Sequence, residues 1–134
     1  MDLDSAIHTH VCWHAILTNA IAERGRLSEI MIAMDNQCDL GRWLHGEGNK
    51  HYAHLASYHT CLALHAAFHQ CAGEVAALIN ASDYARAEAM IEFGSPYLDI
   101  SAALIRTLRA IKTETRSSSG QCSFSRDLPS RATL

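Results

Sequence analysis

The sequence predicts an all-α protein, and three features lead to that prediction. Two prolines and seven glycines leave few breaks in 134 residues. No alternation of β-branched and polar residues is sustained over the length of a strand. Two long segments instead carry apolar residues in steps of three and four, as one face of a helix requires. With 49% hydrophobic residues, the chain can form one globular domain around a single core.

The first helix is expected from Leu3 to Glu23, because an acidic residue stands near its start and Gly25 follows its end. Steps of three and four residues define the face that this helix turns toward the core. That face carries Leu3, Ile7, His10, His14, Leu17 and Ile21. The core side of the first helix therefore carries two histidines.

The next segment contains the unusual run "NQCDLGRWLHGEG", residues 36–48. Three glycines there disfavour a continuous helix, since each costs up to about 1 kcal/mol relative to alanine. Ser28 is a candidate cap for one short helix before the run, and a second short helix is expected from Asp39 to His45. A bound metal ion would explain how so broken a segment is held in place.

The third helix is expected from Lys50 to Ile79, where the alternation of three and four is longest. Its apolar face would carry positions 51, 55, 58, 62, 65, 69, 72, 76 and 79. His65 and His69 fall on that face. Because residues four apart lie one turn above each other, this pair can bind one ion.

A fourth helix is expected from Asp83 to about Ile111, with Ser82 as its N-cap. Pro96 should kink or break it, because proline cannot donate to the carbonyl four residues earlier. After Lys112 the chain becomes polar and rich in serine. We therefore divide the sequence into a helical domain, 1–112, and a polar tail, 113–134, that is expected to be disordered.

Charge and hydropathy exclude several classes of function. The net charge is −3 and the pI is about 6.3, with no basic stripe, so no nucleic-acid partner is expected. No apolar run reaches the length of a membrane span, and the start is acidic where a signal peptide would be basic, so a cytoplasmic protein is expected. Five cysteines without a paired spacing favour free thiols or a metal ligand.

Nine histidines run from His8 to His69 and then stop, which places the candidate site in the first half. In "HAAFH" the residue after the first histidine is Ala66, so the glutamate base of a zinc peptidase is missing. A third imidazole can come from His10 or His14, and a thiolate from Cys38. Three nitrogens and one sulfur suit zinc, and four protein ligands leave no open position for catalysis. No enzymatic activity is expected.

A closed zinc site of this kind can serve as a sensor, and three other interpretations compete with that one. The histidines can be ordinary hydrogen-bonded core residues. A zinc ion can be purely structural and hold an interaction module together. A di-iron centre in a helical bundle would need bridging carboxylates such as Glu-x-x-His pairs on inward faces, and none occurs here.

The residues also resemble a known family. "HVCW" at 10–13, "CDLGRW" at 38–43 and "HAAFH" at 65–69, in this order and separation, are similar to the signature of the chemoreceptor zinc-binding (CZB) domain. The resemblance covers roughly residues 3–112. Carried over by position, it implies one zinc ion bound by His10, Cys38, His65 and His69. His14 has no counterpart in the family pattern.

The resemblance further implies a bundle of four to five helices with one interhelical zinc site, usually as a homodimer. Such domains are attached to bacterial chemotaxis receptors or to diguanylate cyclases and change their output. Some are reported to sense hypochlorous acid through the metal-bound thiol. Neither a receptor coiled coil nor a cyclase domain stands in these 134 residues, so a free-standing member or an excised regulatory fragment is expected.

Overall fold

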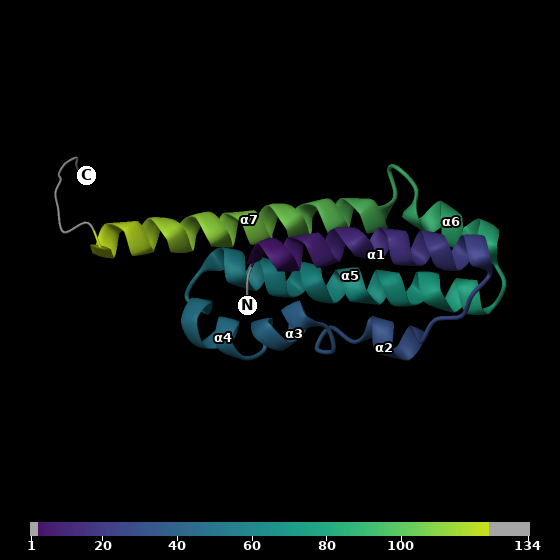
Figure 1. The fold of residues 1–134 in the computed structure, drawn as a ribbon, viewed down its shortest axis with the longest axis horizontal. Helices are drawn as coiled ribbons and strands as arrows, with labels where there is room; N and C mark the ends of the chain where they lie inside the picture. Colours follow the sequence, from purple (N-terminus) through teal and green to yellow (C-terminus); the bar gives the residue numbers. More distant parts are fainter. Residues whose placement is uncertain (1–2, 124–134) are drawn as a thin grey trace.

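The computed structural model describes residues 3–123, with side chains up to residue 114, and every regular element in that part of the chain is helical. The order of the elements can be followed in Figure 1. The helices are α1 (Leu3–Glu23), α2 (Glu29–Ala33), α3 (Asp39–Leu44), α4 (Glu47–Tyr52), α5 (Ala56–Asn80), α6 (Tyr84–Ile91) and α7 (Pro96–Ser123). The predicted all-α class is confirmed, and the larger number of helices reflects four short ones.

The three long helices α1, α5 and α7 lie side by side and form the bundle, while α2, α3 and α4 follow one another along one flank (Figure 1). The central helix is α5, which packs against α7, α2, α6 and α1. Its large buried side chains include Tyr58, Phe68 and Ile79. Burial of this apolar surface is the main source of stability for the bundle.

α5 is also, by length and composition, the one helix in the described part of the chain that could cross a membrane. Buried core helices of soluble proteins meet the same criterion, so this is weak support for a span. Here α5 packs against α7, α2, α6 and α1, and its histidines at positions 65 and 69 are buried. We therefore treat α5 as the core helix of the bundle.

The first helix has the predicted bounds, but the predicted third helix does not. The segment 50–79 is divided between α4 and α5, with an extended Leu55 between them. At this break, Nε2 of His59 lies 2.6 Å from the carbonyl oxygen of Ala53 and can donate a hydrogen bond to it. Positions 51 and 55 of the predicted apolar face therefore lie outside α5. The break contains neither proline nor glycine, and the spacing of three and four residues continues across it. The sequence pattern therefore does not indicate the break.

The C-terminal half differs from the prediction at two points. Asp83, not Ser82, is the N-cap of α6, and its carboxylate accepts from the backbone N–H of Arg86. Past the break before Pro96, α7 continues to Ser123, so the helix does not end near Lys112. Lys112 itself donates to Asp4 at 2.6 Å and joins α7 to the start of α1. Residues 124–134 of the predicted tail lie outside the described residues.

Candidate metal centre

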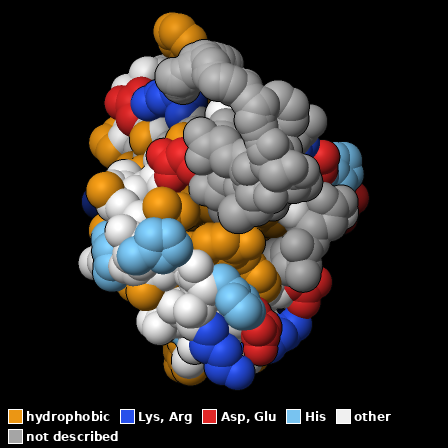
Figure 2. All heavy atoms as spheres, turned by 90° about the vertical axis from the view of Figure 1, so that its left-hand side faces the viewer, with side chains coloured by type: hydrophobic (Ala, Val, Ile, Leu, Met, Phe, Trp, Pro, Cys, Tyr) orange, Lys and Arg blue, Asp and Glu red, His pale blue; other side chains and the backbone are white. Residues whose placement is uncertain are grey.

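Burial separates the nine histidines into two groups. Three are buried in the bundle: His10, His65 and His69. Six are exposed: His8, His14, His45, His51, His54 and His59. Figure 2 shows histidine side chains at the surface on the end of the molecule that it views. Imidazole is costly to bury without partners, so three rings gathered in one core require a common explanation.

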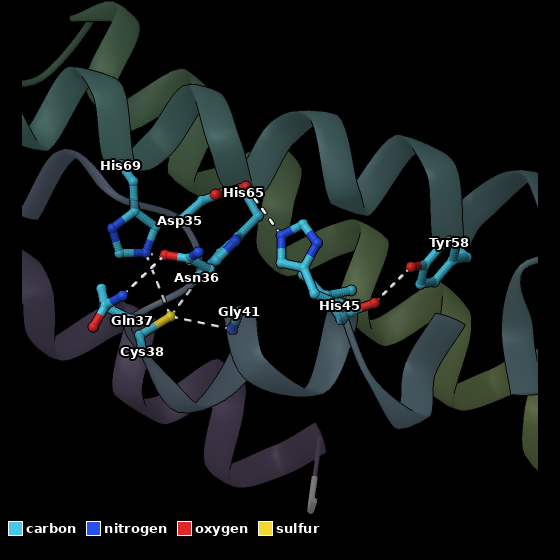
Figure 3. Close-up of polar contacts among 10 residues, drawn as sticks. Asp35, Asn36, Gln37, Cys38, Gly41, His45, Tyr58, His65 and His69 are labelled. Atoms are coloured by element: carbon cyan, nitrogen blue, oxygen red, sulfur yellow. Dashed lines mark hydrogen bonds and ion pairs between the residues drawn. The ribbon is translucent and has the colours of Figure 1, made fainter. Parts of the chain in front are cut away.

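The buried rings of α5 converge on one sulfur atom (Figure 3). Cys38 Sγ lies 3.2 Å from Nε2 of His65 and 3.5 Å from Nε2 of His69, and these two nitrogens are 3.1 Å apart. A tetrahedral zinc ion with bond lengths of about 2.05 Å to nitrogen and 2.3 Å to sulfur would hold such atoms about 3.4 to 3.6 Å apart. The sulfur atom and the two nitrogens therefore need to move apart only slightly to accept the ion.

The fourth donor is His10, which belongs to α1. Its ring centroid is 5.1 Å from that of His65 and 5.9 Å from that of His69. The side chain is 1% exposed, and neither of its ring nitrogens has a hydrogen-bond partner. One donor atom from each of the four residues lies within 4.8 Å of the others. Two unpartnered buried nitrogens beside a thiol and two imidazoles fit a metal ion.

Cys38 is placed by the glycine-marked segment that follows α2. It is the N-cap of α3, and its Sγ accepts a 3.3 Å hydrogen bond from the backbone N–H of Gly41. Position 41 must be glycine, because a Cβ there would lie 1.9 Å from the backbone oxygen of Asp35. The tight approach of these two backbone segments directs the sulfur toward α5. The C-terminal end of α3 is fixed by Tyr58, whose hydroxyl donates to the carbonyl of Leu44 at 2.6 Å.

His69 is held in the orientation and tautomer that a metal ligand needs. Its Nδ1 lies 2.8 Å from the carbonyl oxygen of Ile32, and a carbonyl only accepts, so Nδ1 carries the hydrogen. The lone pair of Nε2 then faces Cys38 and His65. Such a hydrogen bond to the remote ring nitrogen is the usual support of a metal-binding histidine. It also connects α2 to the cluster, although α2 supplies no ligand itself.

The electrostatics keep the imidazoles ready for a cation. Burial and, to a lesser degree, the charge of His69 lower the pKa of His10 to about 4. Burial and the neighbouring histidines lower the pKa of His65 to about 3. Burial also raises the pKa of the Cys38 thiol, against the opposing effect of hydrogen bonds from backbone N–H groups. At neutral pH the histidines are therefore uncharged, and binding of zinc would release the thiol proton.

These pKa shifts predict how the metal-free protein responds to acid. A buried histidine with a lowered pKa contributes stability above the unfolded pKa of 6.5, and this is lost as the pH falls toward the folded pKa of about 4. For His10 alone the loss by pH 4 is about 3 kcal/mol in the free energy of unfolding. Urea unfolding of chelated protein between pH 7.5 and about pH 4 measures this loss.

In this experiment His10→Leu should make the pH profile less steep, with the contributions of His65 and His69 remaining, whereas substitution of the exposed His54 by Gln should leave the profile unchanged. A wild-type protein whose unfolding free energy is constant across this range would show that the three imidazoles are not buried in the neutral form.

His14, the alternative ligand on α1, turns away from the cluster, and its Nε2 lies 3.1 Å from the carbonyl oxygen of Ile91. Trp13 lies beside the site, with its ring 5.8 Å from that of His69. Trp43 packs against Tyr52, with ring centroids 5.7 Å apart.

Sequence reasoning missed the contribution of the α2 region, which has no metal-binding side chain on the cluster. Besides the Ile32 carbonyl, Asp35 lies beside the site, where its charge opposes the lowering of the pKa of His69. Its carboxylate is 3.4 Å from Nε2 of His45 (Figure 3). A backbone carbonyl leaves no signal in a sequence, so only the structure could identify the first of these two contributions.

Three imidazoles and one thiol between α1, α3 and α5 define a helical zinc-binding domain with a His3Cys centre. Comparison with protein families agrees, because the chemoreceptor zinc-binding domain matches residues 10–76, half of the chain. The chain belongs to this family, whose members are zinc-binding sensory domains and not enzymes. Comparison with curated proteins and with solved structures gave no match.

Proposed function

We infer that this domain is a sensor whose zinc centre responds to zinc, to oxidants such as hypochlorous acid, or to both. One observation carries the proposal: the four donor atoms come from three different elements and meet in the core within 4.8 Å. His10 belongs to α1, Cys38 to the N-terminus of α3, and the two remaining histidines to α5. Any change in the metal bonds must therefore change how these elements are held together.

The oxidant response would use the sulfur. Metal binding keeps Cys38 in the thiolate form, which is the nucleophilic form of cysteine. Attack of the thiolate on hypochlorous acid forms sulfenic acid and releases chloride, with sulfur oxidised by two electrons and chlorine reduced. Sulfenic acid is a weaker ligand than thiolate, so the bond to zinc weakens. Burial raises the pKa of Cys61 to about 12, so that thiol would stay protonated and unreactive.

Removal of zinc tests whether the ion is a signal or only a structural support. We expect chelation to leave most of the helical circular dichroism, because nineteen apolar residues in the described part of the chain form a buried core. Hydrogen exchange should increase in 28–45 and in the first turns of α1, and zinc should restore the original protection. A cooperative loss of helicity on chelation would instead show that the ion is purely structural.

The partners follow from the family and remain part of the proposal. We propose a homodimer that acts in the cytoplasm on a bacterial chemotaxis receptor or diguanylate cyclase, with neither nucleic acid nor membrane as a ligand. Exposed apolar side chains, among them Val11, Ile16 and Phe93, support an interface with another protein surface. Light scattering at micromolar concentration would contradict the dimer if it gave the mass of one chain.

A further inference from the structure

A pocket of about 200 Å³ leads from the surface to the sulfur side of the metal centre. Cys38 and His69 line it, together with Trp13, Met31, Met34 and Gln37 among others. We call it the α2 pocket, since Met31 lies on α2 and Met34 directly follows it. The α2 pocket is a route by which a small molecule can reach Cys38 without unfolding the bundle.

Two of the residues that line this pocket are methionines with exposed side chains. Met31 is 50% exposed and Met34 is 39% exposed, although both border the same pocket as the half-buried Cys38. Two of the four methionines in the sequence therefore lie together at one pocket with their side chains exposed. The third internal methionine, Met90, lies on α6 and does not line the pocket.

A methionine thioether and a cysteine thiolate are oxidised by the same class of reagent. Hypochlorous acid transfers its oxygen atom to the thioether sulfur, which loses two electrons, and releases chloride and a proton. The apolar wall of the α2 pocket favours entry of a small uncharged oxidant over a charged one. Met31 and Met34 are more exposed than Cys38, so an oxidant from the solvent has easier access to them than to the thiol.

Building on the proposed oxidant response, we propose that Met31 and Met34 are oxidation sites that intercept hypochlorous acid at the α2 pocket and so set a threshold for Cys38. Each thioether consumes one equivalent of oxidant. Zinc is released only when the supply exceeds what the two methionines remove. Because methionine sulfoxide can be enzymatically reduced, the threshold can be restored.

The test titrates the zinc-loaded protein with hypochlorous acid and measures released zinc with a chromogenic chelator. In the wild type we expect a lag of up to about two equivalents, one for each thioether. The double variant Met31→Leu/Met34→Leu should lose this lag, since leucine fills a similar volume but has no sulfur. Met90→Leu, the matched control, should keep it. Peptide mass spectrometry should find sulfoxide at positions 31 and 34 before oxidation of Cys38.

Each outcome has a distinct meaning. Identical release curves for the wild type and the double variant would overturn the threshold but leave oxidation of Cys38 intact. Oxidation of Met90 as early as of Met31 and Met34 would also overturn it. If neither protein releases zinc and Cys38 stays reduced, the proposed oxidant response itself fails. Zinc content of the double variant before oxidant is added confirms that its site is assembled.

Discussion

Cys38→Ser is expected to abolish zinc binding, with a loss of affinity well above about 100-fold. Substitutions in the surroundings of a metal site already cost up to that factor, and this one removes the only thiolate among four ligands. Serine keeps the size of the side chain, but its hydroxyl is a poor zinc ligand at neutral pH. Elemental analysis of untagged protein should give about one zinc per chain for the wild type and none for the variant.

Cys12→Ser is the matched control, because Cys12 is a free thiol on α1 that lies outside the cluster. It should retain zinc in full. Zinc that persists in Cys38→Ser but disappears in Cys12→Ser would remove Cys38 from the ligand set.

A second pair tests the imidazole from α1. His10→Ala should lose zinc, as His69→Ala should, whereas His14→Ala should keep it, since His14 points to Ile91 and not to the cluster. The two α1 histidines are one turn apart, so the pair separates ligation from a general effect on the helix. Circular dichroism should show both α1 variants to be helical.

Among glycine-to-alanine substitutions in the described part of the chain, Gly41→Ala is expected to destabilise the protein most. In a helix this change normally stabilises by up to about 1 kcal/mol. Here the added Cβ would lie 1.9 Å from the backbone oxygen of Asp35, and no side-chain rotation can relieve a clash with backbone. The segment before Cys38 must move, so we expect destabilisation of about 3 kcal/mol together with weaker zinc binding. Urea unfolding and competition with a zinc chelator measure the two effects.

Gly25→Ala provides the comparison, because a Cβ at position 25 meets nothing within 4 Å. Its unfolding free energy should stay within about 0.5 kcal/mol of the wild type. Equal behaviour of the two alanine variants would show that the backbone of residue 35 does not approach α3 as closely as described.

Much of the fold could be predicted because helices leave a local signal. The bounds of α1 and the short helix from residue 39 follow from spacing and from caps within a few residues. Breaks were harder to predict. The interruption before α5 has no proline or glycine and depends on the side chain of His59 and on packing. The polar composition after Lys112 predicted a disordered tail. A polar composition does not prevent helix formation, however, and α7 continues to Ser123.

For the site, the sequence by itself determined the residue types and the spacing of four residues that puts His65 and His69 on one face of α5. With the family resemblance it also determined the candidate ligand set. The tertiary structure confirms that His10, and not His14, lies in the core. It alone shows that Gly41 must lack a side chain and that the Ile32 carbonyl orients His69. The physical reason is that local periodicity fixes which face a side chain occupies, whereas contacts between distant segments depend on how whole helices pack.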